Sequence, residues 1–555
     1  MINRLTFSSF ILVTFFGCSS YNDIKHEPSF IGEIKDNAEW YKDADGVVTE
    51  IRVHIPKTND FLCAPYDNHE GAQRPCTLED IDGDSDARDD YAPILHVHVE
   101  ADGFISSNEL MNATMKQKGK STRGSSEKSY RIKLDSKEVL IFNERTLQLN
   151  KSPYDKSRIR NKMAFDFFRE VPNITSSKTR FVNLKIDGVD RGFFTHVEKT
   201  DGYFLEARGF SQEDNVYKTQ NFAFFYPDER IKLDDTGKPE NLELFETALE
   251  LDSGEDYYKL IEMVKAINSA KTDAKFSEVF EQYFNRKNYI TWLALNIIMA
   301  NKDTVSQNFY LFNPKYTDKF YFMPWDYDGT GRPDDEYTKV EYGLGNWWGI
   351  PLHKGFIKIK ANRDELDKMV DNIRQNYITP EKIKEKITMY KKLMDPYVIK
   401  SPDVDFVNET RWNDAMNNLV LQLDRDIKNY KDEIGSPMPF WQSVKYDNGD
   451  LILEWEKSID LEGDPIVYDI SFADNVDLNN SIVYERGLDS SSSKLQEVNG
   501  WMQYKTQVPL TSGKSYYMYV ISKEKDNNES YQIAFNKAVR VGKLKYPGLL
   551  EFIVE

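Results

Sequence analysis

The sequence predicts an α+β chain that ends in an all-β part. Over residues 46–435, short segments with alternating apolar and polar residues come first, and long segments with helical periodicity follow. After Pro437 and Pro439 the pattern changes to short strands separated by turns, with the spacing of a β-sandwich over residues 440–545. The chain has 555 residues, which is enough for more than one domain.

The first residues have the features of an export signal. Arg4 supplies a positive charge, and residues 5–17 are apolar but too few to span a bilayer. This segment resembles a bacterial lipoprotein signal in which Cys18 receives the lipid; because bulky aromatic residues precede it, ordinary signal cleavage is the alternative. We expect a signal over residues 1–18, a polar tether over 19–45, and an exported lipoprotein in the periplasm or on the cell surface.

Two further cysteines, Cys63 and Cys76, enclose a short loop. In an oxidising compartment such a pair is expected to form a disulfide. Closing this loop would stabilise the fold by about 3 kcal/mol in the chain-entropy model. Two free buried thiols are the alternative.

The charge of the chain limits its partners. The formal net charge is -19, and no stripe of basic residues with interleaved aromatic residues is present in the sequence. An acidic surface repels the phosphates of nucleic acids and of anionic lipids. We therefore expect no nucleic-acid partner, and membrane attachment through the lipid on Cys18 only.

An acidic segment lies between the first two predicted strands, residues 47–55 and 94–99. Its Asp residues alternate between Asp80 and Asp90, and such a pattern can surround calcium. However, the glycine is at the fourth position instead of the sixth, and no Glu is at the twelfth. A solvated acidic turn is therefore preferred to a calcium loop.

His96, His98 and Glu100 share one face of the second strand, because side chains alternate along a strand. Two His and a carboxylate could bind zinc. An isolated pair of this kind is more often ordinary sheet surface, which is the preferred interpretation here.

The remaining elements follow from periodicity and turn signals. Ser157 is the expected N-cap of a helix over residues 158–168, and Asp187 and Gly188 form a strong hairpin turn. The other expected helices are residues 257–267, 276–299, 357–377 and 380–434, the last with a break near Ser401 and Pro402. The other expected strands are residues 129–134, 180–186, 192–197, 450–455, 466–472, 481–484 and 516–522.

A short aromatic hairpin brings acidic groups together. Asn308 opens its first strand, and Asp326 follows the second. Because the start of one strand lies beside the end of the other in an antiparallel hairpin, we expect Asn308 and Asp326 to converge, with Asp303 on the loop leading in. Protein kinases place their base and metal ligands in this order.

Phosphoryl transfer needs a proton acceptor, metal ligands and cations for the phosphates. Asp303 has the character of the base, and Asn308 and Asp326 offer oxygen ligands to Mg²⁺ or Mn²⁺. Asp328 is either a second ligand or a support for the first. The candidate cations are Lys133 and Arg123, and Glu198 could pair with Lys133. For each of these three residues the alternative is an ordinary surface charge.

Residues of about 90–435 resemble the CotH family of secreted kinase-like proteins. The resemblance rests on an ordered set of motifs at residues 121–123, 128–133, 157–168, 182–188, 191–194, 198–201, 301–311 and 324–328. It implies an atypical protein-kinase-like domain that uses ATP and a divalent cation, with the catalytic Asp at Asp303 and the metal-binding Asp at Asp326. The chain departs from ordinary kinases because it has no G-x-G-x-x-G loop and no His-Arg before Asp303.

The C-terminal part resembles an immunoglobulin or fibronectin type III sandwich. Trp455 on an early strand resembles the core Trp of that fold, and Tyr516 resembles the tyrosine of its conserved corner. Such a domain is expected to bind a protein or a polysaccharide.

Three functions are compatible with these features. The first is an extracytoplasmic protein kinase that transfers phosphate from ATP to Ser or Thr of a surface or secreted protein. The alternative is a catalytically weak kinase-like scaffold, attached at the cell surface through its sandwich. A hydrolase that uses the acidic groups is a third class.

Overall fold

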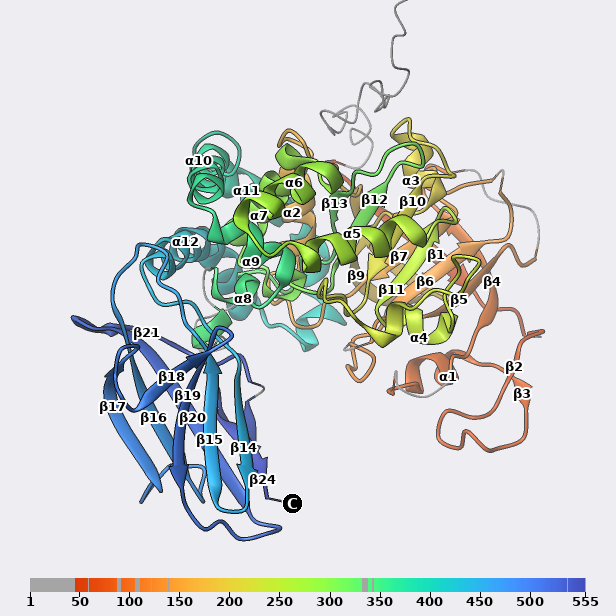
Figure 1. Ribbon diagram of the computed structural model, residues 1–555. Coiled ribbons are helices and arrows are strands. Elements are labelled where there is room, and N and C mark those ends of the chain that lie inside the picture. Colours follow the sequence, from red (N-terminus) through yellow and green to blue (C-terminus); the bar gives the residue numbers. More distant parts are fainter. Residues whose placement is uncertain are drawn as a thin grey trace, which may run out of the picture.

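The structure is a computed structural model. It describes residues 45–57, 59–86, 91–104, 110–120, 122–137, 139–331, 338–341, 344–536 and 538–554. The expected signal and tether, with Cys18, lie outside these residues. Within them, no helix combines the length and apolar character needed to cross a membrane. The mixed α and β composition, with β-sheets at the C-terminus, agrees with the fold class expected from the sequence (Figure 1).

The N-terminal strands form a closed barrel. Its order is β1-β4-β5-β6-β7-β9-β8, and β1 closes it by pairing in parallel with β8. Asp187 and Gly188, in the turn between β8 and β9, have φ angles of 48° and 78°, as the predicted two-residue hairpin turn requires. The strands are β1 (Val48–His54), β4 (Leu95–Ala101), β5 (Ala113–Lys118), β6 (Ser129–Leu134), β7 (Thr146–Asn150), β8 (Thr179–Ile186) and β9 (Val189–Val197).

The predicted disulfide between Cys63 and Cys76 is present. It joins Cys63, in the first strand of the small hairpin of β2 (Leu62–Cys63) and β3 (Arg74–Pro75), to Cys76, which directly follows the second strand and lies two residues before α1 (Leu78–Gly83). The hairpin lies beside α1 at the outer edge of the barrel, on the side away from α10 and α12 (Figure 1).

The acidic segment is partly a helix, so the prediction of a solvated turn is wrong for its first half. Thr77 caps α1, and Asp80 is buried with both oxygens against the guanidinium of Arg74, at 2.6 and 2.9 Å. Asp82 and Asp84 pair with Arg191 and Arg123 respectively. Helical winding directs these carboxylates to different arginines instead of toward one ion. Residues 87–90 lie outside the described part.

His96 and His98 form ion-pair contacts along the surface of the barrel. His96 Nε2 lies 2.7 Å from Asp135, and His96 Nδ1 lies 3.3 Å from Asp60. His98 Nε2 contacts Glu100 at 3.4 Å. These contacts agree with the preferred interpretation as sheet surface.

The helix α2 (Arg160–Phe168) does not use Ser157 as its N-cap, so that prediction is wrong. The N-cap residue is Ile159, whose side chain makes no capping bond. Asp155 accepts from the Ser157 hydroxyl at 2.6 Å and from the Arg160 backbone N–H at 2.9 Å. Because Arg158 has a positive φ of 64°, the chain turns before the helix, and the cap comes from further upstream.

A second sheet, of order β11-β10-β12-β13, lies between the barrel and most of the helices (Figure 1). Its strands are β10 (Asn215–Thr219), β11 (Leu249–Ser253), β12 (Phe309–Asn313) and β13 (Tyr321–Pro324). All five residues of β12 and all four of β13 are buried. The hairpin that holds the candidate site is therefore the interior of a sheet, fixed by packing on both faces.

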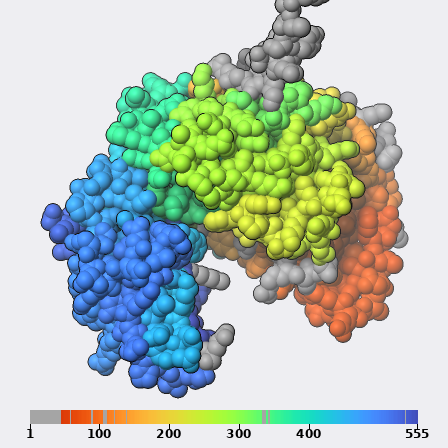
Figure 2. All heavy atoms as spheres, viewed as in Figure 1, coloured from red at the N-terminus to blue at the C-terminus, as the bar shows by residue number. Residues whose placement is uncertain are grey.

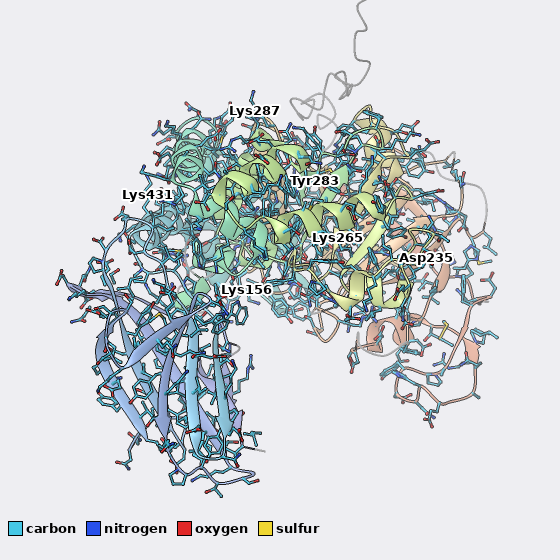
Figure 3. All side chains as sticks on the ribbon, viewed as in Figure 1. Lys156, Asp235, Lys265, Tyr283, Lys287 and Lys431 are labelled. Carbon is cyan, nitrogen blue, oxygen red and sulfur yellow. A yellow bond between two sulfur atoms is a disulfide. The ribbon has the colours of Figure 1, made fainter. Side chains whose placement is uncertain are left out.

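The helices follow the expected segments with two corrections. The segment 276–299 is broken at Phe284, and Asn285 caps the second of the two helices by accepting a hydrogen bond from Asn288 N–H. The segment 357–377 is divided in the same way at Ile359. The helices are α3 (Gly202–Ala207), α4 (Leu242–Glu246), α5 (Tyr258–Ser269), α6 (Asp273–Tyr283), α7 (Arg286–Ile298), α8 (Gly345–Trp348), α9 (Pro351–Lys358), α10 (Lys360–Asn376), α11 (Pro380–Val398) and α12 (Glu409–Ile434). Figure 3 marks Lys265 on α5, Tyr283 at the end of α6 and Lys431 on α12.

The C-terminal part is all β, as predicted. One sheet has the order β14-β15-β19-β18 and the other β17-β16-β20-β21, with β24 also paired to β20. Trp455 is fully buried in the shared core, and the Tyr516 hydroxyl accepts from Thr511 N–H at 2.9 Å. The strands are β14 (Gln442–Asp447), β15 (Asp450–Glu456), β16 (Ile466–Ala473), β17 (Val483–Asp489), β18 (Leu495–Val498), β19 (Trp501–Gln507), β20 (Ser515–Glu524), β21 (Asn527–Ile533), β22 (Val539–Val541), β23 (Leu544–Tyr546) and β24 (Leu550–Ile553).

The sandwich is a separate lobe that contacts the helices rather than the barrel. Figure 2 shows it below the helical region, with open space between it and the N-terminal strands. Its contacts to the helices include the hydrogen bond from Arg363 Nη2 of α10 to Leu461 O, at 2.9 Å.

Candidate functional site

The hairpin of β12 and β13 brings the predicted metal ligands to one end of the second sheet. Phe309 is paired with Pro324, so Asn308 precedes and Asp326 closely follows the same paired end. Both residues have positive φ angles, 59° and 57°. This conformation is uncommon for residues other than glycine and concentrates at functional sites. The predicted convergence of Asn308 and Asp326 agrees with this register.

Asp303 lies in a short 3-10 turn, Lys302–Thr304, directly after α7. Asn301 Nδ2 donates to Asp326 O at 3.3 Å, which joins this turn to the segment after β13. The Thr304 hydroxyl and the Tyr327 hydroxyl both donate to Asn296 Oδ1 in α7, at 3.0 and 2.8 Å. The turn with Asp303 and the segment with Asp326 are thus held by the same buried amide.

Asp326 and Asp328 form a pair of like charges. Burial, the charge of Asp326 and the charge of Asp155 raise the pKa of Asp328 well above its ordinary value. A divalent cation bound between two partly buried carboxylates would offset their mutual repulsion and favour the ionised form of both. With the carboxamide of Asn308, they would offer hard oxygen ligands of the kind that Mg²⁺ or Mn²⁺ prefers.

Lys118, which was not among the candidates from the sequence, lies close enough to these carboxylates for both charges to act on it. It is the last residue of β5, donates to Asn150 Oδ1 at 2.7 Å, and has its Nζ 5.4 Å from the centroid of the Trp325 ring. Burial lowers the pKa of Lys118 to about 8, although the charge of Asp326 acts in the opposite direction. Lys118 also begins the basic, glycine-containing segment 118–124, which was the available sequence signal.

Two further cations lie near Lys118. Arg131 of β6 and Lys218 of β10 repel it electrostatically, so both lie in the same region. The Nε atom of Arg131 is buried and has no hydrogen-bond partner. Because phosphate oxygens accept such donors, the group of Lys118, Arg131 and Lys218 would suit a polyphosphate.

Lys133 and Arg123 lie less favourably for contact with the phosphates than the sequence predicts. Lys133 is exposed on β6 and pairs in register with Thr114, four residues along β5 from Lys118. At the rise of a strand this separates the two positions by about 13 Å. Arg123 Nη1 is held by Asp84 at 2.9 Å.

Glu198 does not pair with Lys133, which corrects that expectation. Both its oxygens accept from the guanidinium of Arg208, at 3.1 and 2.7 Å, and Oε2 also accepts from Lys178 N–H at 2.8 Å. The Glu198 and Arg208 side chains are only 3% and 2% exposed. Glu198 therefore anchors α3 to the barrel from the interior, whereas Lys133 lies at the surface.

Replacing Lys118 by methionine is expected to stabilise the protein at neutral pH by about 1–3 kcal/mol, since it removes a buried charge. The folded chain holds Lys118 with a pKa of about 8 against an ordinary 10.5, so wild-type stability rises with pH between these values. The advantage of Lys118→Met should therefore shrink from pH 7 to pH 10.5. Urea unfolding at several pH values measures this. The exposed Lys133→Met is the control, and a pH-independent difference for Lys118→Met would contradict the argument.

The comparison with known proteins decides the family. A family model described as "CotH kinase protein" matches residues 115–424, which is more than half of the chain. The chain belongs to the CotH family. The CotH match covers Lys118, Asp303, Asn308, Asp326 and Asp328, and it confirms the resemblance stated from the motifs. It ends before the sandwich.

The chain is also similar to the inner spore coat protein H of Bacillus subtilis (strain 168). It is 27% identical over 300 residues, which cover 52% of this chain and 79% of that protein. As its name says, that CotH relative is a coat protein of the spore.

Proposed function

We propose that the protein is an atypical protein kinase that transfers the γ-phosphoryl group of ATP to a Ser or Thr hydroxyl of another protein. The observation that carries this proposal is the placement of Lys118, which lies 5.4 Å from the Trp325 ring and close enough to Asp326 and Asp328 for their charges to act on it. Membership of a family described as kinases supports it. A lysine beside paired carboxylates supplies charges of both signs, which phosphate and metal binding need.

Each residue has a role in this proposal. Asp303 accepts the proton of the attacking hydroxyl while the new oxygen–phosphorus bond forms and the bond to the β-phosphate oxygen breaks. Asn308 and Asp326, with Asp328, hold the divalent cation, which supplies charge neutralisation for the phosphates when it is bound. Lys118 and Arg131 contact the phosphates. ADP is the leaving group.

The site of action proposed is outside the cytoplasm. Support comes from the lipoprotein-like signal that ends at Cys18, from the disulfide between Cys63 and Cys76, and from the spore-coat relative. In this proposal the lipid anchors the chain, and the fibronectin type III-like sandwich binds a surface protein or polysaccharide. Mass spectrometry of the mature N-terminus tests the anchor, because an unmodified Cys18 or cleavage elsewhere would exclude it.

The activity is tested by incubating the purified chain with γ-labelled ATP, Mg²⁺ or Mn²⁺, and a surface-protein extract. Label on Ser or Thr of a protein, lost on addition of a chelator and in Asp303→Ala, is the expected result. Equal labelling by wild type and Asp303→Ala would overturn the proposal. Nucleotide binding without transfer would favour a scaffold, and release of free phosphate without protein labelling would favour a hydrolase.

A further inference from the structure

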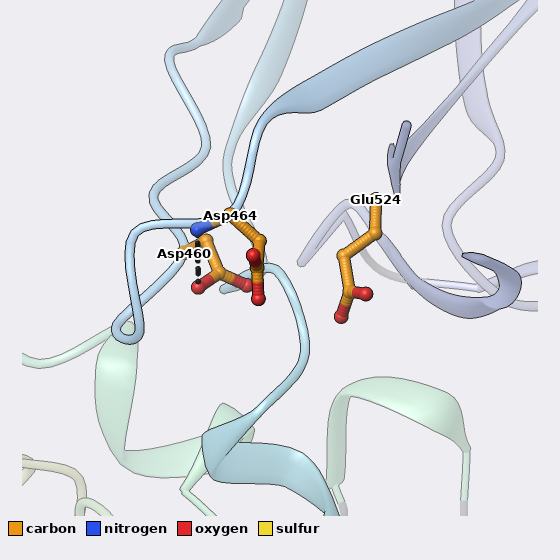
Figure 4. Close-up of side chains that lie close together, drawn as sticks. All are labelled: Asp460, Asp464 and Glu524. Carbon is orange, nitrogen blue, oxygen red and sulfur yellow. Dashed lines mark hydrogen bonds between the residues drawn. The ribbon is translucent and has the colours of Figure 1, made fainter. Parts of the chain in front are cut away.

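Three acidic side chains gather at the end of the sandwich nearest the helices. Asp460 and Asp464 lie in the connection between β15 and β16, and Glu524 is the last residue of β20. One oxygen of each carboxylate lies within 4.8 Å of an oxygen of both others. Figure 4 shows the three side chains converging from these two segments.

Asp460 is fixed in place and has an oxygen with no partner. Its Oδ1 accepts three backbone N–H bonds, from Glu462 at 2.8 Å, Gly463 at 2.8 Å and Asp464 at 3.1 Å. Its Oδ2 is buried without a hydrogen-bond partner, and the whole residue is 8% exposed. In Figure 4 this second oxygen lies on the side of Asp464 and Glu524. An orphaned buried carboxylate oxygen is costly unless a ligand satisfies it.

Cations of the protein do not neutralise this cluster. Among the described residues, no ion pair joins Asp460, Asp464 or Glu524 to a Lys, Arg or His; the hydroxyl of Ser530 donates to Glu524 Oε1. Lys525, next in sequence to Glu524, pairs instead with Asp489 at 3.8 Å. Three carboxylates this close repel one another, and no ion pair within the described part of the chain compensates this repulsion.

We propose that Asp460, Asp464 and Glu524 bind a calcium ion. Calcium accepts six to eight oxygens at about 2.3–2.6 Å, so ligands on opposite sides of it are about 5 Å apart, as in this cluster. The three carboxylates supply up to six oxygens in monodentate or bidentate form, and water completes the shell. Mg²⁺ fits less well because it requires shorter, octahedral bonds and keeps more of its own water.

The ion would brace the junction between the sandwich and the helices. Leu461, inside the calcium-binding connection, accepts the bond from Arg363 of α10. Ser530, which contacts Glu524, also contacts Gly435 O at 3.3 Å, directly after α12. A cation that joins residues 460–464 to β20 therefore fixes both segments that contact the helical part. This inference does not depend on the proposed activity.

Titration calorimetry of the full exported chain tests the site, without nucleotide and in the Asp326→Asn background, which removes a ligand of the other metal site. One calcium ion per chain is expected to bind, at least tenfold more tightly than magnesium. Calcium should also raise the melting temperature of the sandwich by about 5 °C at saturation. Binding should fall at least tenfold in Glu524→Gln and in Asp460→Asn, each of which keeps the shape of the side chain.

The control is Asp526→Asn, which removes an exposed charge two residues from Glu524 and should change affinity less than twofold. Circular dichroism without calcium verifies that the variants are folded. The proposal is overturned if calcium produces neither binding heat nor a melting shift, if Glu524→Gln and Asp460→Asn bind as wild type does, or if Asp526→Asn loses as much affinity as they do.

Discussion

Replacing Asp326 by asparagine is expected to lower the rate of phosphate transfer by about 10³-fold, while the protein becomes no less stable. The rate falls because one carboxylate of the proposed metal site is lost, and such charge stabilisation is worth several kcal/mol in the transition state. Stability is retained because Asp326 repels the partly buried Asp328, and this repulsion helps to raise the pKa of Asp328. Removing it lets Asp328 ionise at lower cost.

The measurement combines initial rates of transfer with thermal melting of wild type and Asp326→Asn. Asp318→Asn, in the turn at the opposite end of the same hairpin, is the matched control and should keep its rate within about twofold. A variant that loses activity together with several degrees of melting temperature would point to a structural role for Asp326. A variant with full activity would remove Asp326 from the metal site.

Replacing Glu198 by glutamine is expected to destabilise the protein by about 3–5 kcal/mol, the cost of leaving one member of a buried ion pair alone. Arg208 would keep its charge in the interior without the two bonds that Glu198 now accepts. The charge of Glu198 also contributes, after burial, to raising the pKa of Glu144. Its removal should therefore lower the pKa of Glu144, which offsets a part of the loss.

Urea unfolding followed by far-ultraviolet circular dichroism measures this change. Glu206→Gln, on the exposed side of α3, is the control and should stay within about 0.5 kcal/mol of wild type. Nucleotide affinity of folded Glu198→Gln should be unchanged, since Glu198 binds Arg208 at the end of α3 and not the residues proposed to hold the phosphates. A selective loss of nucleotide affinity without a loss of stability would return Glu198 to the nucleotide site.

The sequence was sufficient for features that depend on local pattern. The hairpin around Asn308 and Asp326 could be predicted because strand alternation, a turn and antiparallel pairing determine which residues meet. The turn at Asp187 and Gly188 could be predicted for the same reason. The sandwich strands also followed from alternation and turn spacing.

Features that depend on distant segments could not be derived in this way. Lys118 is one of several alternating cations on β5 and β6, and only the approach of β10 and of Trp325 shows that it lies near Asp326. No motif indicated β10. The partner of Glu198 was missed because Arg208 reaches it only after α3 has turned the chain back toward the barrel.

The barrel is closed by the parallel pairing of β1 with β8, and β1 lies far upstream of the residues matched by the family model. A chain shortened to residues 115–424 would lose β1 and β4, and so would expose the unpaired edges of β8 and β5. Open edges of this kind recruit strands from other molecules and lead to aggregation. We therefore expect that the barrel does not fold from residues 115–424 alone, and that shortened variants for binding studies must retain Val48–His54.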